Sequence, residues 1–277
     1  MRPYESTLSM IGRLMLALLF LWAGFHKVFN PEGTQQYMTA YGLTIGTMLL
    51  YLAATVIEFA GGLSLALGHT TRDAVFLLVL FMVLVTAIFH PHLTDPNQVI
   101  HFAKNLAIIG GLFYVGAYGP GARSMDVQDH VSRDSAVAGS HLAALTLTGR
   151  MLLGGLFMLS GLNQILDPER ARRYMAAIGL FSGSEFFYVG AILLEMGGAL
   201  SLWLGWRTRA GAAALILFLI PATMIFHRTS MSFVLDATVQ DQQFHVMKNL
   251  AIFGGLVYVM AYGAGPISLD ARRTLHR

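Results

Sequence analysis

The chain has 277 residues, of which 55% are hydrophobic and only 12% carry a charged side chain. Ordinary soluble domains have about 25% charged residues, so the mean hydropathy of +0.60 indicates a membrane protein. The chain has no cysteine, which excludes disulfides, thiol redox chemistry and thiolate metal sites. Its net charge of +3 includes no basic run of the kind that binds nucleic acid.

Eight apolar stretches follow one another along the chain. They cover residues 8–29, 46–68, 73–90, 98–118, 146–166, 186–205, 210–227 and 244–263. A helix needs about 20 apolar residues to cross the hydrocarbon core. The first stretch has no A-x-A cleavage site and its counterpart lies in mid-chain, so it is not a signal peptide. The sequence therefore predicts an all-α integral membrane protein with eight transmembrane helices.

The second half of the chain repeats the first. Gly12-Arg13 returns 137 residues later as Gly149-Arg150, and His101-x-x-Lys104-Asn105 returns 144 residues later as His245-x-x-Lys248-Asn249. Four helices per repeat bring both halves into and out of the membrane on the same side, which predicts a parallel duplication. We expect two four-helix bundles, at residues 1–126 and 146–277, joined by a polar linker at 127–145.

Paired glycines occur within several of the apolar stretches. Small residues let helix backbones approach closely in lipid. We therefore interpret these glycines as packing residues: Gly61-Gly62, Gly110-Gly111, Gly154-Gly155, Gly197-Gly198 and Gly254-Gly255.

Basic residues are divided unequally between the two predicted sides of the membrane. The side that holds both termini has eleven of the 18 lysine and arginine residues, and cytoplasmic loops carry such an excess. We therefore expect a bacterial-type inner membrane protein with both termini in the cytoplasm. The basic run Arg170–Arg173 lies on the opposite side and indicates a segment that faces solvent or lipid headgroups.

Ionisable side chains lie inside several predicted spans. A charge at the centre of a span costs about 2.5–3.5 kcal/mol on insertion scales and marks function by default. Glu58 lies in the second stretch, and His101, Lys104 and Asn105 lie on the fourth, where positions three or four apart share a face. The second half repeats them as Glu195, His245, Lys248 and Asn249.

These residues are predicted to converge near the non-cytoplasmic side, where His26, Lys27 and His90 also lie. A contact between Glu58 and Lys104, direct or through water, would neutralise both charges. Two interpretations are open. The group is either a buried ion pair with histidine caps that fixes helix packing, or a polar pocket for a proton or a headgroup.

The two halves differ in their histidines and lysines. His26-Lys27 becomes Asn163-Gln164, and His92 has no counterpart after His227, so we expect an active site in the first half. His26, His90, His92 and His101 offer ligands for copper, zinc or iron, and His26 or His101 could bind haem. We favour histidine caps over either a metal or a haem.

At the terminal side, Arg13 and Arg150 lie one turn inside the membrane face. Asp126 and Asp270 follow the last helix of each repeat on the same side. We expect the ion pairs Arg13–Asp126 and Arg150–Asp270 to close the two bundles.

Short motifs run through the first half in a fixed order: Gly12-Arg13, Gly24-Phe25-His26-Lys27, Asn30-Pro31, Glu58 before Gly61-Gly62, Gly68, Lys104-Asn105-Leu106-Ala107 and Ser124-Met125-Asp126. Together they resemble the DoxX family of small membrane proteins, and the resemblance covers nearly the whole chain. Members are typically single four-helix units, so the chain resembles two fused units. The resemblance implies a membrane component of an electron-transfer or redox-protective system that contacts quinone.

On this hypothesis, His101 or Lys104 hydrogen-bonds a quinone carbonyl, and Glu58 donates or accepts a proton. Electrons would come from a redox partner protein, a haem or a metal, because the chain has neither cysteine nor a nucleotide motif. Two alternatives stay open: a small-molecule or ion transporter, for which Pro221 is the only helix interruption, and a non-catalytic scaffold or assembly factor. A homo-oligomer in the lipid bilayer is compatible with all three.

Overall fold

The computed structural model describes residues 3–128, 139–177, 184–226 and 237–275, and all regular structure in these ranges is helical. The helices are α1 (Pro3–Phe29), α2 (Pro31–Ala40), α3 (Thr47–Leu67), α4 (Thr71–Phe89), α5 (Pro96–Tyr118), α6 (Met125–Gln128), α7 (Gly139–Leu166), α8 (Pro168–Ala177), α9 (Ser184–Leu204), α10 (Thr208–Phe226), α11 (Ala237–Tyr262) and α12 (Leu269–Leu275). Most of the predicted linker, residues 129–138, lies outside the described ranges.

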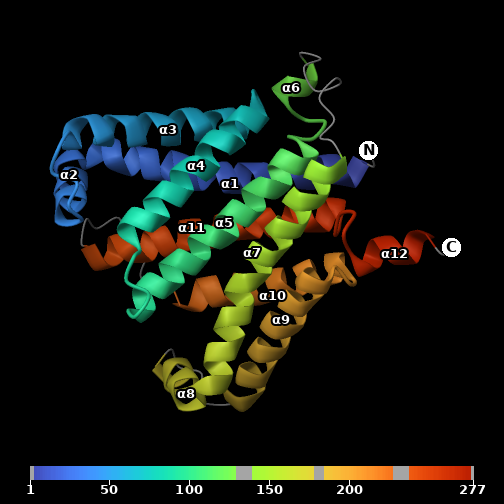
Figure 1. The fold of residues 1–277 in the computed structure, drawn as a ribbon. Helices are drawn as coiled ribbons and strands as arrows, with labels where there is room; N and C mark the ends of the chain where they lie inside the picture. The colour runs from blue at the N-terminus through green and yellow to red at the C-terminus, as the bar shows by residue number, and fades with distance from the viewer. Residues whose placement is uncertain (1–2, 129–138, 178–183, 227–236, 276–277) are drawn as a thin grey trace.

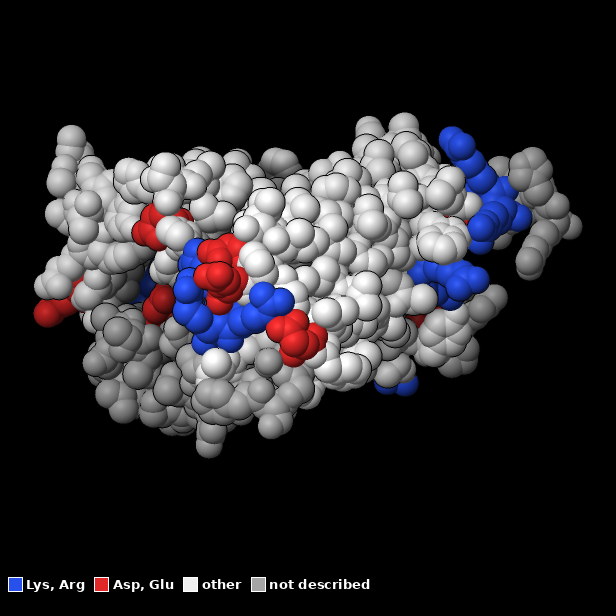
Figure 2. Space-filling view, turned by 90° about the horizontal axis from the view of Figure 1, so that it is seen from below, with Lys and Arg blue, Asp and Glu red and all other residues white. Residues whose placement is uncertain are grey.

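Seven of the described helices are long and apolar enough to cross a membrane: α1, α3, α4, α5, α7, α9 and α11. α10 adds a shorter apolar segment, Thr208–Met224. On the face seen in Figure 2, charged side chains gather toward two ends and leave a band without charge between them. The predicted all-α membrane fold of eight helices in two repeats is confirmed.

Two short helices, α2 and α8, follow the first span of each repeat, where the sequence analysis had separated no element. Each begins at a proline preceded by a capping residue, and proline is favoured at the first helical position because its missing N–H is not needed there. The Asn30 side chain accepts from the Gly33 N–H at 3.1 Å, and Asp167 accepts from the Arg170 N–H at 3.0 Å. α8 carries the basic run Arg170–Arg173, and Arg170, Arg172 and Arg173 on it are exposed.

The two repeats are joined by an exchange of helix partners. α1 packs on α3 of its own unit and on α11, the last span of the other unit. α7 likewise packs on α9 and on α5, and α5 also packs on α11. Figure 1 shows α1 beside α11 and α5 beside α7, with both chain termini on one side of the molecule. The first span of each unit therefore covers the last span of its neighbour.

Glycines allow this close approach between the units. A Cβ on Gly12 of α1 would lie 2.6 Å from the carbonyl oxygen of Gly254 on α11. A Cβ on Gly149 of α7 would lie 2.8 Å from that of Gly110 on α5. These two contacts occupy equivalent positions of the repeat, which is the pattern of a pseudo-twofold interface.

Tyrosines cross the same interface near the chain termini. The Tyr114 hydroxyl donates to the Gly263 carbonyl at 3.1 Å, and the Tyr258 hydroxyl donates to the Gly119 carbonyl at 3.3 Å. Both tyrosines are fully buried, and buried tyrosine hydroxyls need such partners. Equivalent ends of the two units thus meet, as a parallel duplication requires.

The predicted ion pairs Arg13–Asp126 and Arg150–Asp270 are wrong, because both partners bind backbone groups instead. Asp126 accepts from the N–H groups of Thr70 and Thr71 at 2.7 and 3.0 Å, at the start of α4. Asp270 accepts from Arg207 and Thr208 at 2.8 and 2.9 Å, at the start of α10.

These caps hold backbone in the left-handed region, since φ is +44° at Thr70 and +48° at Arg207. The arginines meanwhile donate to carbonyls: Arg13 to Pro120 and Arg123, and Arg150 to Leu202 and Ile267. Each unit is therefore closed at this end by backbone hydrogen bonds rather than by ion pairs.

Candidate functional site

A cluster of buried polar side chains lies where α5 crosses α11, at the end of the molecule away from the termini. The Lys104 Nζ lies 2.9 Å from Nδ1 of His245, and the Lys248 Nζ lies 2.9 Å from Nδ1 of His101. Each lysine of one unit thus meets the histidine of the other. All four residues are at most 9% exposed. We call these residues, together with Asp241, the central cluster.

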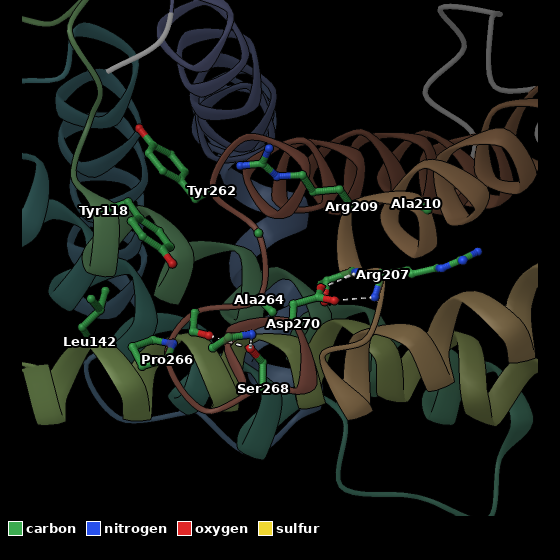
Figure 3. A pocket seen from close by; sticks show the side chains of 14 residues that line it. Tyr118, Leu142, Arg207, Arg209, Ala210, Tyr262, Ala264, Pro266, Ser268 and Asp270 are labelled. Carbon is green, nitrogen blue, oxygen red and sulfur yellow. Dashed lines mark hydrogen bonds between the residues drawn. The ribbon is translucent and has the colours of Figure 1, made fainter. Parts of the chain in front are cut away.

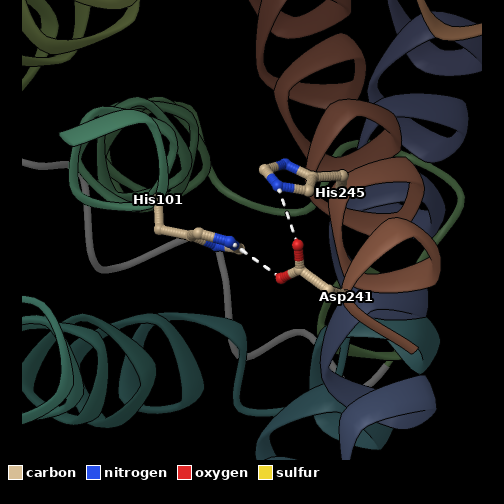
Figure 4. A group of neighbouring side chains, drawn as sticks. All are labelled: His101, Asp241 and His245. Atoms are coloured by element: carbon tan, nitrogen blue, oxygen red, sulfur yellow. Dashed lines mark hydrogen bonds and ion pairs between the residues drawn. The ribbon is translucent and has the colours of Figure 1, made fainter. Parts of the chain in front are cut away.

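Asp241 links the two histidines. Its Oδ1 lies 3.0 Å from Nε2 of His101, and its Oδ2 lies 3.7 Å from Nε2 of His245. Figure 4 shows the carboxylate between the two rings. The sequence analysis missed Asp241, although it lies one turn before His245 on the same helix face. Its counterpart in the first unit is Asn97, so only one acid stands at this interface of the described residues.

His90 adds a further ring to the cluster. It is stacked on His101 with ring centroids 5.1 Å apart, and its Nδ1 lies 2.7 Å from Oε1 of Gln98. His90 follows the last residue of α4, outside the spanning segment. Burial lowers the pKa of His90 to about 4, and the charge of Lys248 acts in the same direction against the Gln98 hydrogen bond. The His90 ring is therefore neutral at physiological pH.

The expected contact between Glu58 and Lys104 is not made. Glu58 on α3 accepts two hydrogen bonds from the Lys27 Nζ, at 2.8 and 2.7 Å. The reason is the packing of α3 against α1, which brings Lys27 to the carboxylate, while Lys104 on α5 faces α11. The candidate residues of the first unit are thus divided between two locations.

The second unit has the same arrangement with a neutral partner. Gln164 replaces Lys27 and donates to the Glu195 carboxylate, which is 1% exposed. The Lys27 and Gln164 carbonyls also accept from the hydroxyls of Tyr51 and Tyr188, at 3.1 and 2.9 Å. The frame around the two glutamates is repeated, and only the charge of the partner differs.

Three other predicted residues, Asn105, Asn249 and His26, have partners outside the central cluster. Asn105 and Asn249 donate to Thr86 and Thr223 of their own units, at 3.0 and 2.9 Å. The His26 ring contacts Phe244 of the other unit, with centroids 5.5 Å apart.

Of the four histidines considered as metal ligands, only His90 and His101 stack on each other. His92 is exposed, and His227 lies outside the described residues. The described residues instead place one ligand atom each of His101, Asp241 and His245 within 4.8 Å of one another.

A separate pocket of about 830 Å³ lies at the terminal end, lined by Tyr118, Tyr262, Arg209 and Asp270 among others (Figure 3). Tyr118 ends α5, whereas His101 lies near its beginning. The two sites are therefore about 25 Å apart along that helix. The Tyr118 and Tyr262 rings stack with centroids 4.3 Å apart.

The central cluster can donate several hydrogen bonds. A protonated lysine has three N–H donors, and among the described residues Lys104 and Lys248 each have one hydrogen-bond partner, a histidine nitrogen. The hydrogen bond between Asp241 of α11 and His101 of α5 also links the two units.

These features define a class of protein, a multi-pass membrane protein built from two repeated four-helix units around a shared polar interface. The model of the DoxX family matches residues 8–91 and 145–228. The chain therefore belongs to the DoxX family.

Two relatives from Escherichia coli (strain K12) correspond to about half of the chain. The inner membrane protein YqjF is 35% identical over 126 residues, which cover 46% of this chain and 95% of YqjF. The inner membrane protein YphA is 35% identical over 126 residues, which cover 43% of this chain and 88% of YphA. Each relative thus has about the length of one unit.

A third relative spans the whole chain. The Surfeit locus protein 4 homolog of Schizosaccharomyces pombe is 22% identical over 282 residues, which cover 100% of this chain and 85% of that protein. No solved structure matches the chain.

Proposed function

We propose that this protein is the membrane component of a redox system and that its central cluster binds the headgroup of a quinone. The observation that carries the proposal is the pair of buried lysines. Lys104 and Lys248 are 7% and 9% exposed, and a buried ammonium needs acceptors for its hydrogens. A quinone has two carbonyl oxygens that can accept from two such donors, and it is soluble in the bilayer.

The histidines give this site a route for protons. Reduction of a quinone consumes protons, and a general acid must lie within hydrogen-bond reach of the atom it protonates. Asp241 contacts His101 and His245, which in turn contact Lys248 and Lys104. A proton can therefore move along hydrogen bonds from Asp241 through His101 to Lys248. Glu58, which the sequence analysis placed in this role, is engaged with Lys27.

The chain needs a source of electrons. It has no cysteine, so we propose that a redox partner protein supplies them, either directly or through a bound metal. Isolation of the protein from membranes with its bound partners, followed by mass spectrometry, tests for such a partner. Native mass spectrometry of the same sample tests for a homo-oligomer.

The experiment compares quinone binding by the purified protein and by lysine variants. A short-chain quinone should raise the melting temperature, because a ligand that binds only the folded state stabilises it. Lys104→Met and Lys248→Met should each remove most of this rise. Arg173→Met is the control, because Arg173 is 73% exposed on α8. The proposal fails if quinone stabilises none of the proteins, or if it stabilises the lysine variants as much as the original chain.

A second candidate function is a membrane scaffold or assembly factor. It is favoured by the partners that every residue of the central cluster already has within the protein. In that case, quinone would not raise the melting temperature of the original chain, and the lysine variants would lower the melting temperature measured without quinone.

We also propose that both termini face the cytoplasm. Arginines gather at the end of the molecule that holds them, with Arg207, Arg209, Arg272 and Arg273 on the second unit alone. Because the chain has no cysteine, single cysteines at exposed positions such as Ser140 and His92 can be labelled in intact cells. Reagents that do not cross the inner membrane should label position 92 only. Labelling of position 140 would reverse the proposed orientation.

A further inference from the structure

The Asp241 carboxylate and two histidine rings from different units surround a common point. Nε2 of His101 lies 3.0 Å from Oδ1, and Nε2 of His245 lies 3.7 Å from Oδ2. One ligand atom from each of the three residues lies within 4.8 Å of the others. Figure 4 shows Asp241 and His245 on one helix, with His101 reaching them from the other. Two of the three side chains thus come from α11, and the third comes from α5.

We propose that His101, Asp241 and His245 bind a divalent transition-metal ion between the two units. Two imidazoles and one carboxylate with open positions form the ligand set of non-haem ferrous iron, whereas magnesium and calcium prefer oxygen ligands. Bonds of about 2.0–2.2 Å to such ligands hold neighbouring ligand atoms about 3 Å apart. The 3.0 Å between His101 and Asp241 already meets this spacing. A small movement of the His245 ring completes the site.

The outer ring nitrogens have the partners that metal-binding histidines require. A histidine ligand almost always donates the N–H of its other nitrogen to an acceptor, which fixes the tautomer and the ring orientation. Here that partner is Lys248 for His101 and Lys104 for His245, each at 2.9 Å. In the metal-bound state, both Nε2 atoms present a lone pair to the ion, and each Nδ1 hydrogen points at a lysine nitrogen, which accepts it as a neutral amine and keeps two N–H donors.

This inference deepens the proposed function and rests on it for its purpose. It assigns the Asp241 oxygens and the two Nε2 atoms to the metal, in place of the proton route described above. A redox-active metal would supply the one-electron carrier that a chain without cysteine lacks. Metal binding itself is measured without quinone, so the two proposals can fail separately.

The test titrates the full-length protein in detergent after a chelator has removed metal and washing has removed quinone. Zn²⁺ binding is followed by calorimetry and Co²⁺ binding by visible absorption. We expect one ion per chain and Co²⁺ bands of mixed nitrogen and oxygen ligation. Asp241→Asn and His245→Gln should each weaken binding by at least about 10-fold, since even outer partners of a metal site typically contribute 10–100-fold. His92→Gln, at an exposed position, should bind as the original chain does.

The metal site is refuted if the original chain gives no Co²⁺ bands, or if Asp241→Asn and His245→Gln bind as tightly as His92→Gln. Circular dichroism and gel filtration identify any variant that does not fold, and the Co²⁺ spectrum of the original chain decides the question without variants. Quinone stabilisation without metal binding would refute this inference alone. Metal binding without quinone stabilisation would leave the metal site and refute the quinone headgroup.

Discussion

Glu58 in the first unit and Glu195 in the second occupy the same position of the repeat but have different partners. Lys27 gives Glu58 a positive charge at 2.7 Å, whereas Gln164 gives Glu195 only an amide. The tyrosines that bond to the neighbouring carbonyls, Tyr51 and Tyr188, are the same in both units. The two units therefore share the residues around the buried glutamate and differ in the charge of its partner.

The same distinction applies at the interface. The glycine contacts, the crossing tyrosines and the lysine–histidine pairs all occur twice. Asp241 occurs once, because Asn97 holds its position in the first unit. Residues that hold the fold follow the symmetry, and residues that set local charge depart from it. Four experiments test this distinction, in order of the effect we expect.

Separating the units should have the largest effect. Residues 1–128 and 139–277 expressed alone would each expose the faces of α1 and α5, or of α7 and α11, that the other unit covers. We expect neither to remain a monodisperse monomer in gel filtration in detergent, and co-expression to restore a stable pair. A stable monomer of either half would show that the exchanged helix packing is not essential.

Removing the partner of each buried glutamate should destabilise the first unit more than the second. Lys27→Met leaves Glu58 buried without a cation, which typically costs about 3–5 kcal/mol. Gln164→Met removes a hydrogen bond to Glu195, which costs about 1.5–3 kcal/mol if the carboxyl is charged. Thermal unfolding in detergent measures both variants. Equal losses would mean that the charge of Lys27 is immaterial to stability.

Filling a glycine contact should disturb the shared framework. A Cβ on Gly254 would lie 2.4 Å from the Gly12 carbonyl oxygen, whereas one on Gly155 meets nothing within 4 Å. We expect Gly254→Ala to lower the free energy of unfolding by about 1–3 kcal/mol, as overpacking does. Gly155→Ala should be neutral or slightly stabilising, because alanine favours helix. Similar melting temperatures would contradict the close interface.

The smallest effect should come from the cap at Asp270, outside the spanning helices. Burial acts to raise the pKa of Asp270, but hydrogen bonds from the backbone of Thr208 and Arg207 lower it below the usual value. Its stabilisation is therefore fully present above about pH 3.9, the unfolded value, and is lost as the pH falls through the lower folded pKa.

Asp270→Asn should cost about 1 kcal/mol at neutral pH, typical of a lost helix cap, and the difference should vanish in acid. Thermal unfolding from pH 6 to pH 3 measures it. A difference that persists at the lowest pH would show that the carboxylate charge does not stabilise the cap.

The sequence was sufficient to predict the spanning helices but not their partners. Gly254 was recognisable as a packing residue, yet nothing in the sequence says that it packs on Gly12. Hydropathy identifies which segments span the membrane, and it does not say which other helix each of them packs on. The exchange of α1 and α7 between units depends on that choice.

The same limit explains why only part of the candidate site was predicted. His101 and Lys104 were expected in a polar group, and they lie in one, but their partners come from the other unit. Lys27 and Glu58 were both singled out, and their pairing depended on knowing that α1 lies against α3. Asp241 was not predicted because it has no acidic counterpart in the first half, so the repeat does not mark it. Its i, i+4 spacing to His245 was the available signal.

The single carboxylate between His101 and His245 depends on the two units belonging to one chain. In a dimer of identical subunits, any residue beside the symmetry axis must appear twice, so one acid there would entail two. A fused chain is not subject to that rule and can place an odd number of charges beside its pseudo-twofold axis. The duplication thus allowed Asp241 and Asn97 to diverge, and it gave this membrane protein a site that a symmetric pair of subunits cannot build.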